Sequence, residues 1–125
     1  MTLRVARHTT DLDRMIRFYG DILGLEVLGR FADHNGYDGV FIGIPKAPWH
    51  LEFTTSQHPP VHHPDADDPL VFYMDSAEEL TTVQQRFTSF DVMPVVPKNP
   101  YWQQNGTQYN DPDGYGVIIA LKGHY

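Results

Sequence analysis

The chain has 125 residues, 41% of them hydrophobic and 20% charged, so it is long enough for one folded domain and too apolar to be disordered. Its formal net charge of −7 repels phosphate backbones and argues against a nucleic-acid partner. It has no cysteine for disulfides or thiolate chemistry, no signal-peptide pattern and no apolar run of membrane-spanning length. We therefore expect a cytoplasmic protein with no membrane partner.

The first half of the chain is predicted to form a strand, a helix and three further strands. Asp11 has the chemistry of a helix N-cap, and apolar residues recur after it at helical spacing until Gly24, where a helix can end. The expected elements, in chain order, are a strand over 3–9, a helix over 12–23, and strands over 25–31, 37–44 and 49–55, with a turn at 34–36.

Residues 56–68 are predicted to be a linker. This segment contains three prolines, three histidines and three aspartates, and its hydrophobic residues show no periodicity. The linker separates a first module, residues 1–55, from a second module, residues 69–125, within one domain over 1–125.

The second half repeats the layout of the first. Ser76 and Glu79 form an S-x-x-E capping box at the start of a helix, and Asp111-Pro112-Asp113-Gly114 has the composition of a tight turn. The expected elements are strands over 70–74 and 92–96, a loop over 98–106, and a hairpin of strands 107–110 and 115–121, the last apolar enough to be buried on both faces.

Two tandem βαβββ modules therefore predict an α+β fold. The helix caps Asp11 and Ser76 are 65 residues apart, which is about half the chain. Neither module can cover its own sheet, so we expect two curved mixed sheets around a shared cleft.

Two motifs connect this chain to a known superfamily. The run D-L-D-R-M-I-R-F-Y-G-D-I-L-G-L-E-V-L (Asp11–Leu28), with D-P-D-G (Asp111–Gly114) in the second half, resembles the vicinal oxygen chelate superfamily. This superfamily includes glyoxalase I, the extradiol dioxygenases, and the fosfomycin and bleomycin resistance proteins. The resemblance covers essentially the whole chain and implies the glyoxalase/bleomycin resistance fold, on which several chemistries and pure binding occur.

The resemblance also implies where a metal would be held. Enzymes of the superfamily usually bind one metal through His, Gln or Glu side chains from the first and last strand of each half. The matching positions here are Arg4, Glu52, Pro69 and Ile118, and only Glu52 is a metal ligand. We therefore expect no metal cofactor, and we expect Arg4 and Glu52 to face each other as an ion pair that is either structural or orients a ligand.

A displaced metal site is the alternative. By strand alternation, His8 lies on the same face as Arg4, and His50 lies on the same face as Glu52. His8, His50 and Glu52 together would make a His₂Glu set that suits a divalent metal such as zinc or iron. A simpler interpretation is that these side chains are polar lining of the cleft.

Aromatic residues form a second group of candidates. Tyr101 and Trp102 in the proline-rich loop, with Tyr73 and Tyr109 on strands, are expected to stack on a planar or cationic ligand. The competing interpretation is that Tyr101 and Trp102 pack beneath a loop or at a dimer interface.

Two functions fit these observations. The first is a metal-free, homodimeric binding protein similar to the bleomycin resistance branch, with a small-molecule ligand that the acidic charge predicts to be cationic. The second is a glyoxalase- or dioxygenase-like lyase, isomerase or oxygenase, with Glu52 as its catalytic residue. Whether the chain is an enzyme stays open. The predicted ligand-binding residues are Arg4, His8, His50, Glu52, Tyr73, Tyr101, Trp102 and Tyr109.

Overall fold

The computed structural model describes residues 1–123 and has two compact units, Met1–His62 and His63–Tyr125. The division falls inside the predicted linker, and residues 56–68 are described without a helix or strand. Each unit has one mixed sheet and its own helices, which confirms the predicted α+β class. The shared cleft stays a prediction.

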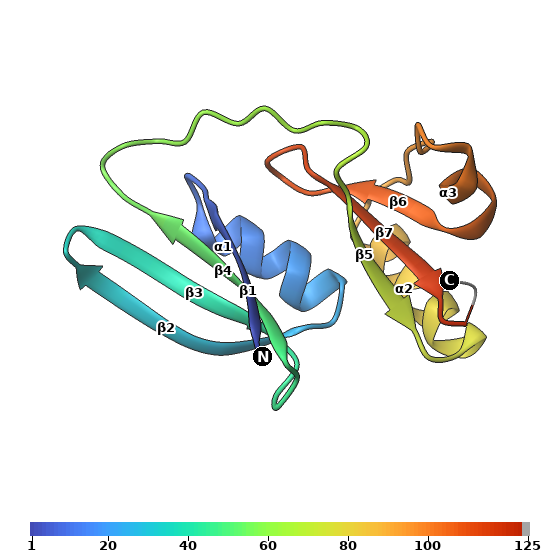
Figure 1. The fold of residues 1–125 in the computed structure, drawn as a ribbon, viewed down its shortest axis with the longest axis horizontal. Helices are drawn as coiled ribbons and strands as arrows, with labels where there is room; N and C mark the ends of the chain where they lie inside the picture. Colours follow the sequence, from blue (N-terminus) through green and yellow to red (C-terminus); the bar gives the residue numbers. More distant parts are fainter. Residues whose placement is uncertain (124–125) are drawn as a thin grey trace. The chain divides into compact units, whose positions relative to one another are not determined.

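The first unit is a four-stranded sheet with a helical segment on one face (Figure 1). The strand order is β1-β4-β3-β2; β1 and β4 are parallel, and the other neighbours are antiparallel. The elements are β1 (Leu3–His8), α1 (Leu12–Met15), η1 (Ile16–Ile22), β2 (Glu26–His34), β3 (Tyr37–Gly43) and β4 (Trp49–Thr55). The βαβββ layout predicted for this half is confirmed.

The helical segment begins where the sequence places its cap. Asp11 is extended, and its carboxylate accepts a hydrogen bond from the Arg14 backbone N–H at 3.2 Å. After Met15 the backbone widens into η1, a π-helix. Its buried face is pressed against the sheet, where the Tyr19 ring stacks on Phe53 with centroids 5.0 Å apart. The segment ends at Gly24, whose φ of 101° favours glycine.

The turn between β2 and β3 is one residue shorter than predicted. His34 pairs with Tyr37 and belongs to β2, so the prediction that it starts the turn is wrong. Asn35 and Gly36 form the turn, with φ values of 53° and 85°. Asn-Gly adopts this paired left-handed conformation readily, because its twist matches that of the two strands.

The second unit is a three-stranded sheet of order β5-β7-β6, with β5 and β7 parallel. Its elements are β5 (Leu70–Met74), α2 (Ala77–Ser89), α3 (Pro100–Asn105), β6 (Thr107–Asn110) and β7 (Gly116–Leu121). The central strand is β7, and its residues 117–119 are 0% exposed, which confirms the predicted burial of both faces. In Figure 1, α2 lies along one face of this sheet.

The start of α2 also follows from the sequence. The Ser76 hydroxyl accepts a hydrogen bond from the Glu79 N–H at 3.1 Å, as the capping box requires. The Glu79 carboxylate accepts from the N–H of Asp75, the residue before the cap, at 3.0 Å. The buried side of α2 carries Val83 and Phe87.

Two predictions for the proline-rich segment are wrong. The strand expected over 92–96 is a single bridge, Val95 to Gln108, because Pro94 has no N–H to extend the ladder. The loop expected over 98–106 contains α3. The Asn99 side chain caps this helix, and Pro100 occupies its first turn, where a proline is tolerated. The second unit is therefore βααββ.

Among the described residues, no helix is long and apolar enough to cross a membrane.

The turn between β6 and β7 is held by one buried carboxylate. Asp111 is 5% exposed, and its Oδ1 accepts from the N–H groups of Asp113 at 2.9 Å and Tyr115 at 3.0 Å. Gly114 closes the turn with a φ of 90°. Asp111 thereby supplies the acceptor for two backbone N–H groups that have no strand partner in the turn.

We expect Asp111→Ala to lower the free energy of unfolding by about 1–3 kcal/mol, because it leaves two donors at a buried turn unsatisfied. Urea denaturation at neutral pH measures this loss. Asp21→Ala, which removes an exposed carboxylate from η1, is the control. A loss in Asp111→Ala no larger than that of the control would contradict the role given to the turn.

Candidate functional site

The candidate site is the face of the first sheet that points away from η1. On β4, Leu51 and Phe53 are buried against the helical segment, so His50 and Glu52 point to the other side. The parallel pairing of β1 with β4 places Arg4 directly beside His50. We call this surface the polar face.

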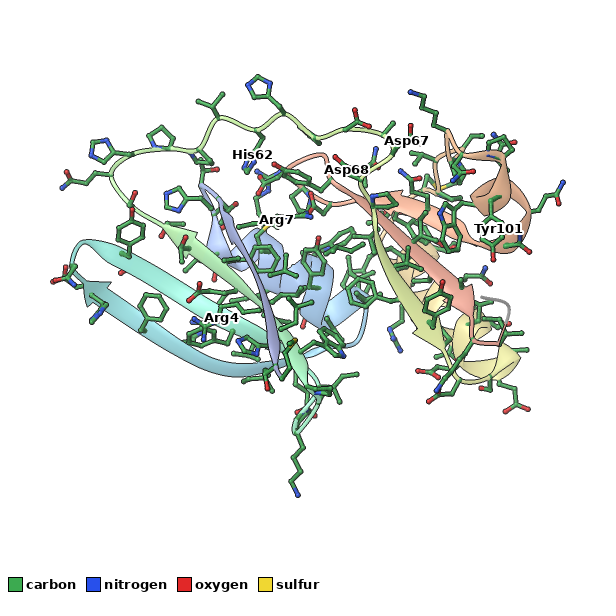
Figure 2. All side chains as sticks on the ribbon, viewed as in Figure 1. Arg4, Arg7, His62, Asp67, Asp68 and Tyr101 are labelled. Carbon is green, nitrogen blue, oxygen red and sulfur yellow. The ribbon has the colours of Figure 1, made fainter. Side chains whose placement is uncertain are left out.

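Three contacts hold the Arg4 guanidinium on the polar face. Arg4 Nε donates to His50 Nε2 at 2.9 Å, and an Arg4 terminal nitrogen lies 3.6 Å from Glu52 Oε2. The guanidinium carbon also lies 4.8 Å from the ring centroid of Phe41 on β3, a cation–π distance. The predicted Arg4–Glu52 pair is therefore present. In Figure 2 the labelled Arg4 lies over the first sheet.

The Arg4–Glu52 pair is partly open to solvent. The Arg4 side chain is 50% exposed and the Glu52 side chain 15% exposed. An ion pair open to water on one side contributes about 0–1 kcal/mol to stability. Its geometry nevertheless presents a fixed donor group and a fixed acceptor group side by side.

The hydrogen bond from Arg4 assigns the tautomer of His50. An arginine Nε always carries a proton in proteins, so His50 Nε2 is the acceptor and the ring proton lies on Nδ1. The Nε2 lone pair is then directed at Arg4. A metal could use this nitrogen only after Arg4 had moved.

His8 lies on the same strand as Arg4 but has other partners. Its Nδ1 is 2.7 Å from Thr54 Oγ1, and its Nε2 is 3.0 Å from both Ser56 Oγ and the His58 carbonyl oxygen. A carbonyl only accepts, so Nε2 carries the proton and Nδ1 accepts from Thr54. His8 therefore ties down the start of the linker, and it does not join Arg4 and Glu52.

The four positions that match the superfamily's metal ligands are divided between the two units, with Arg4 and Glu52 in the first and Pro69 and Ile118 in the second. Within residues 1–123, no three or more His, Cys, Asp or Glu side chains are grouped so that they could hold a metal ion, and this covers His8, His50 and Glu52. In the second unit, Ile118 is 0% exposed beneath α3, where its Cγ2 would lie 2.7 Å from a Cβ added at Gly106. Ile118 has no atom that could bind a metal.

Three of the four predicted aromatic residues come together in the second unit. The Trp102 ring packs edge-on against Tyr101, with centroids 4.8 Å apart, and lies 6.5 Å from Tyr73. All three line one hollow of about 310 Å³ beside β7. They meet because Tyr101 and Trp102 lie on α3, which the sequence analysis missed.

Tyr109, the fourth, belongs to the core. It is 3% exposed, and its ring stacks on Phe87 with centroids 3.7 Å apart and planes at 6°. Burial raises the pKa of the Tyr109 phenol above its ordinary value, since the charged form would lose its hydration. The expectation that Tyr109 stacks on a ligand is wrong for this arrangement, because α2 covers its ring.

Two features of the first unit were missed by the sequence analysis. The first is Phe41, whose ring contacts Arg4. Phe41 pairs with Glu52 across β3 and β4, so the alternation of side chains along β3 was the signal that could have identified it. A second hollow, of about 590 Å³, lies near the start of α1. Its charged lining consists of Asp11, Asp13, Asp38 and Arg30.

Comparison with protein families identifies both halves of the chain. Residues 3–54 match the model of the YycE-like N-terminal domain, and residues 67–120 match that of the YycE-like C-terminal domain. An uncharacterized protein of Bacillus subtilis, YycE, is 43% identical over 120 residues, which cover 94% of this chain and 85% of that protein.

Solved structures share the fold of this chain. A crystal structure of Bacillus subtilis YycE, a protein of unknown function, superposes with a TM-score of 0.88 at 39% identity, covering 99% of this chain and 91% of that one. Leishmania major glyoxalase I gives 0.76 at 22% identity, covering 98% and 86%. The fosfomycin resistance protein FosX of Listeria monocytogenes gives 0.70 at 13%, covering 96% and 89%, and these last two likenesses concern the fold alone.

The burial of Tyr109 leads to a test at alkaline pH. The pKa of Tyr109 is higher in the folded than in the unfolded protein. The stability that depends on its protonated phenol is therefore fully present below about pH 10, where an unfolded tyrosine stays protonated, and is lost as pH rises above that value. We expect Tyr109→Phe to keep the stacking on Phe87 and to lose less stability than the wild type between pH 9 and 11. Urea midpoints across this range measure the difference. Identical losses in both proteins would contradict the burial of the phenol.

Proposed function

The chain belongs to the YycE-like family and has the fold of the vicinal oxygen chelate superfamily, and from this premise we propose that it binds a small organic molecule without a metal. The binding surface would be the polar face. One observation carries the proposal: at the place where the superfamily's enzymes put a metal ligand, Arg4 is held against Glu52 and His50.

The argument begins with the chemistry of Arg4. A guanidinium cannot lose its proton in proteins, so it offers no lone pair with which to bind a metal ion. Glu52, the only one of the four matching residues whose side chain can bind a metal, is paired with this charge at 3.6 Å. The polar face is therefore suited to hydrogen-bonding an organic ligand directly.

The ligand is proposed to carry a positive charge. The formal net charge is −7, so the field of the whole chain attracts cations. Outside the polar face, near the start of α1, the hollow of about 590 Å³ is lined in part by three aspartates, one arginine and the Phe31 ring. Carboxylates beside an aromatic ring are a suitable environment for an organic cation. Homodimer formation and a cytoplasmic location remain predictions.

A binding screen tests the proposal. Protein treated with a chelator is incubated with a panel of small organic cations and their neutral analogues, and thermal shift identifies binders. We expect a cationic binder whose affinity is unchanged, within about twofold, when Mn²⁺, Zn²⁺ or Ni²⁺ is added. A stoichiometric divalent ion that binds the protein and is required for ligand binding would refute the metal-free function.

The variant Glu52→Gln assigns the binder to the polar face. It removes the acceptor charge but keeps the size of the side chain, and we expect at least about tenfold weaker binding by calorimetry. Asp75→Asn is the matched control, because Asp75 forms an exposed ion pair with Lys122 at 3.7 Å in the second unit. Equal affinities in Glu52→Gln and wild type would exclude the polar face as the binding surface.

A further inference from the structure

We propose that the hollow beside β7 is a second binding site, and that it takes an uncharged planar aromatic ring of one or two fused cycles. All of its lining residues that the structure describes belong to the second unit. The inference goes beyond the proposed function, since it involves neither the polar face nor the hollow near α1.

The aromatic wall of this site is built before any ligand arrives. Asn99 Oδ1 accepts from the Tyr101 N–H at 3.0 Å, and the Asn105 side chain donates to the Tyr101 carbonyl at 2.9 Å. The Gln103 side chain donates to the Pro97 carbonyl at 2.8 Å, which joins α3 to the preceding segment. These bonds hold one short helix at both ends, so the Tyr101 and Trp102 rings are presented in a fixed arrangement.

The floor of the site exists because two strands differ in length. Thr107, the first residue of β6, pairs with Ile119, whereas β7 continues to Leu121. Ala120 and Leu121 therefore pair with β5 on one side and border the hollow.

Gly106 allows α3 to approach this floor closely. A Cβ at Gly106 would lie 2.7 Å from Ile118 Cγ2 and 3.1 Å from Trp102 Cε3, both closer than van der Waals contact. Its backbone is extended, with φ of −158°, so the absence of a side chain at this position serves proximity and not backbone geometry.

The lining determines the class of ligand. Of the described residues that border the hollow, none carries a charge, so a charged group entering it would lose its hydration without an ion partner. Three aromatic rings offer faces and edges that suit another planar ring. A volume of about 310 Å³ corresponds to the small end of ligand pockets. Tyr73 and Tyr101 are 39% and 44% exposed, so a ring can reach them from solvent.

Trp102 can report on its own site. The chain contains two tryptophans, Trp49 and Trp102, so the Trp49→Phe protein has a single indole N–H signal in a ¹H–¹⁵N spectrum. Quinoline, which is uncharged at pH 7.5, is titrated into this protein. We expect the Trp102 signal to shift and saturate with a one-site curve. A shift that stays linear up to the solubility limit of quinoline would overturn the proposal.

Two variants locate the binding. Tyr101→Ala, in the same Trp49→Phe background, is expected to weaken quinoline binding by about fivefold or more. Tyr37→Ala is the matched control, since Tyr37 is 46% exposed and lies on β3 of the first unit. Gly106→Ala is expected to weaken binding similarly by displacing Trp102, with Gly20→Ala as its control because a Cβ there meets only ordinary contacts. Unchanged affinity in Tyr101→Ala would refute the site, whatever Gly106→Ala does to folding.

Charge is tested with the same ring. N-methylquinolinium and quinoline-2-carboxylate keep the fused rings but carry a permanent positive or a negative charge, and we expect both to bind at least about threefold more weakly than quinoline. Tighter binding of the quinolinium would show that cation–π attraction outweighs desolvation and would overturn the uncharged class. Because Glu52→Gln does not touch this hollow, quinoline binding and the polar-face ligand succeed or fail separately.

Discussion

The strand order within each unit depends on parallel pairing between the first and the last strand of that unit. In the first unit β1 pairs with β4, and in the second β5 pairs with β7. Parallel strands need a long connection, and here the helix and the intervening strands of each unit provide it. The pairing joins Arg4 to His50, 46 residues further along the chain. A shift of the β1–β4 register by one residue would turn either Arg4 or Glu52 toward the apolar side and remove the cluster.

The first unit separates its packing from its chemistry by the two faces of one sheet. The buried face is filled by Met15, Tyr19, Leu51 and Phe53, which leave no room for a polar ligand. The opposite face carries Arg4 with its three contacts. Substitutions on the polar face can therefore be made without removing core contacts, and the modest energy of an exposed ion pair implies a small loss of stability.

The second unit replaces a strand by a helix, and its aromatic hollow follows from that replacement. Proline at 94 prevents a regular fourth strand in this sheet, while Pro100 is tolerated at the start of α3. The helix then brings Trp102 close to β7, where it borders the hollow together with Ile119, Ala120 and Leu121.

Local signals in the sequence determined the helix starts, most strands and the family. Asp11 and Ser76 cap their helices through hydrogen bonds between neighbouring residues, and strands 49–55 and 70–74 have the predicted bounds. The sequence also carried local signals for α3, namely the Asn99 cap and Pro100 in the first turn. Only the tertiary structure decided that Tyr109 lies under α2 and that Phe41 supports Arg4. These outcomes depend on strand register and on which face a neighbouring helix covers, and both are set by contacts between residues far apart in the chain.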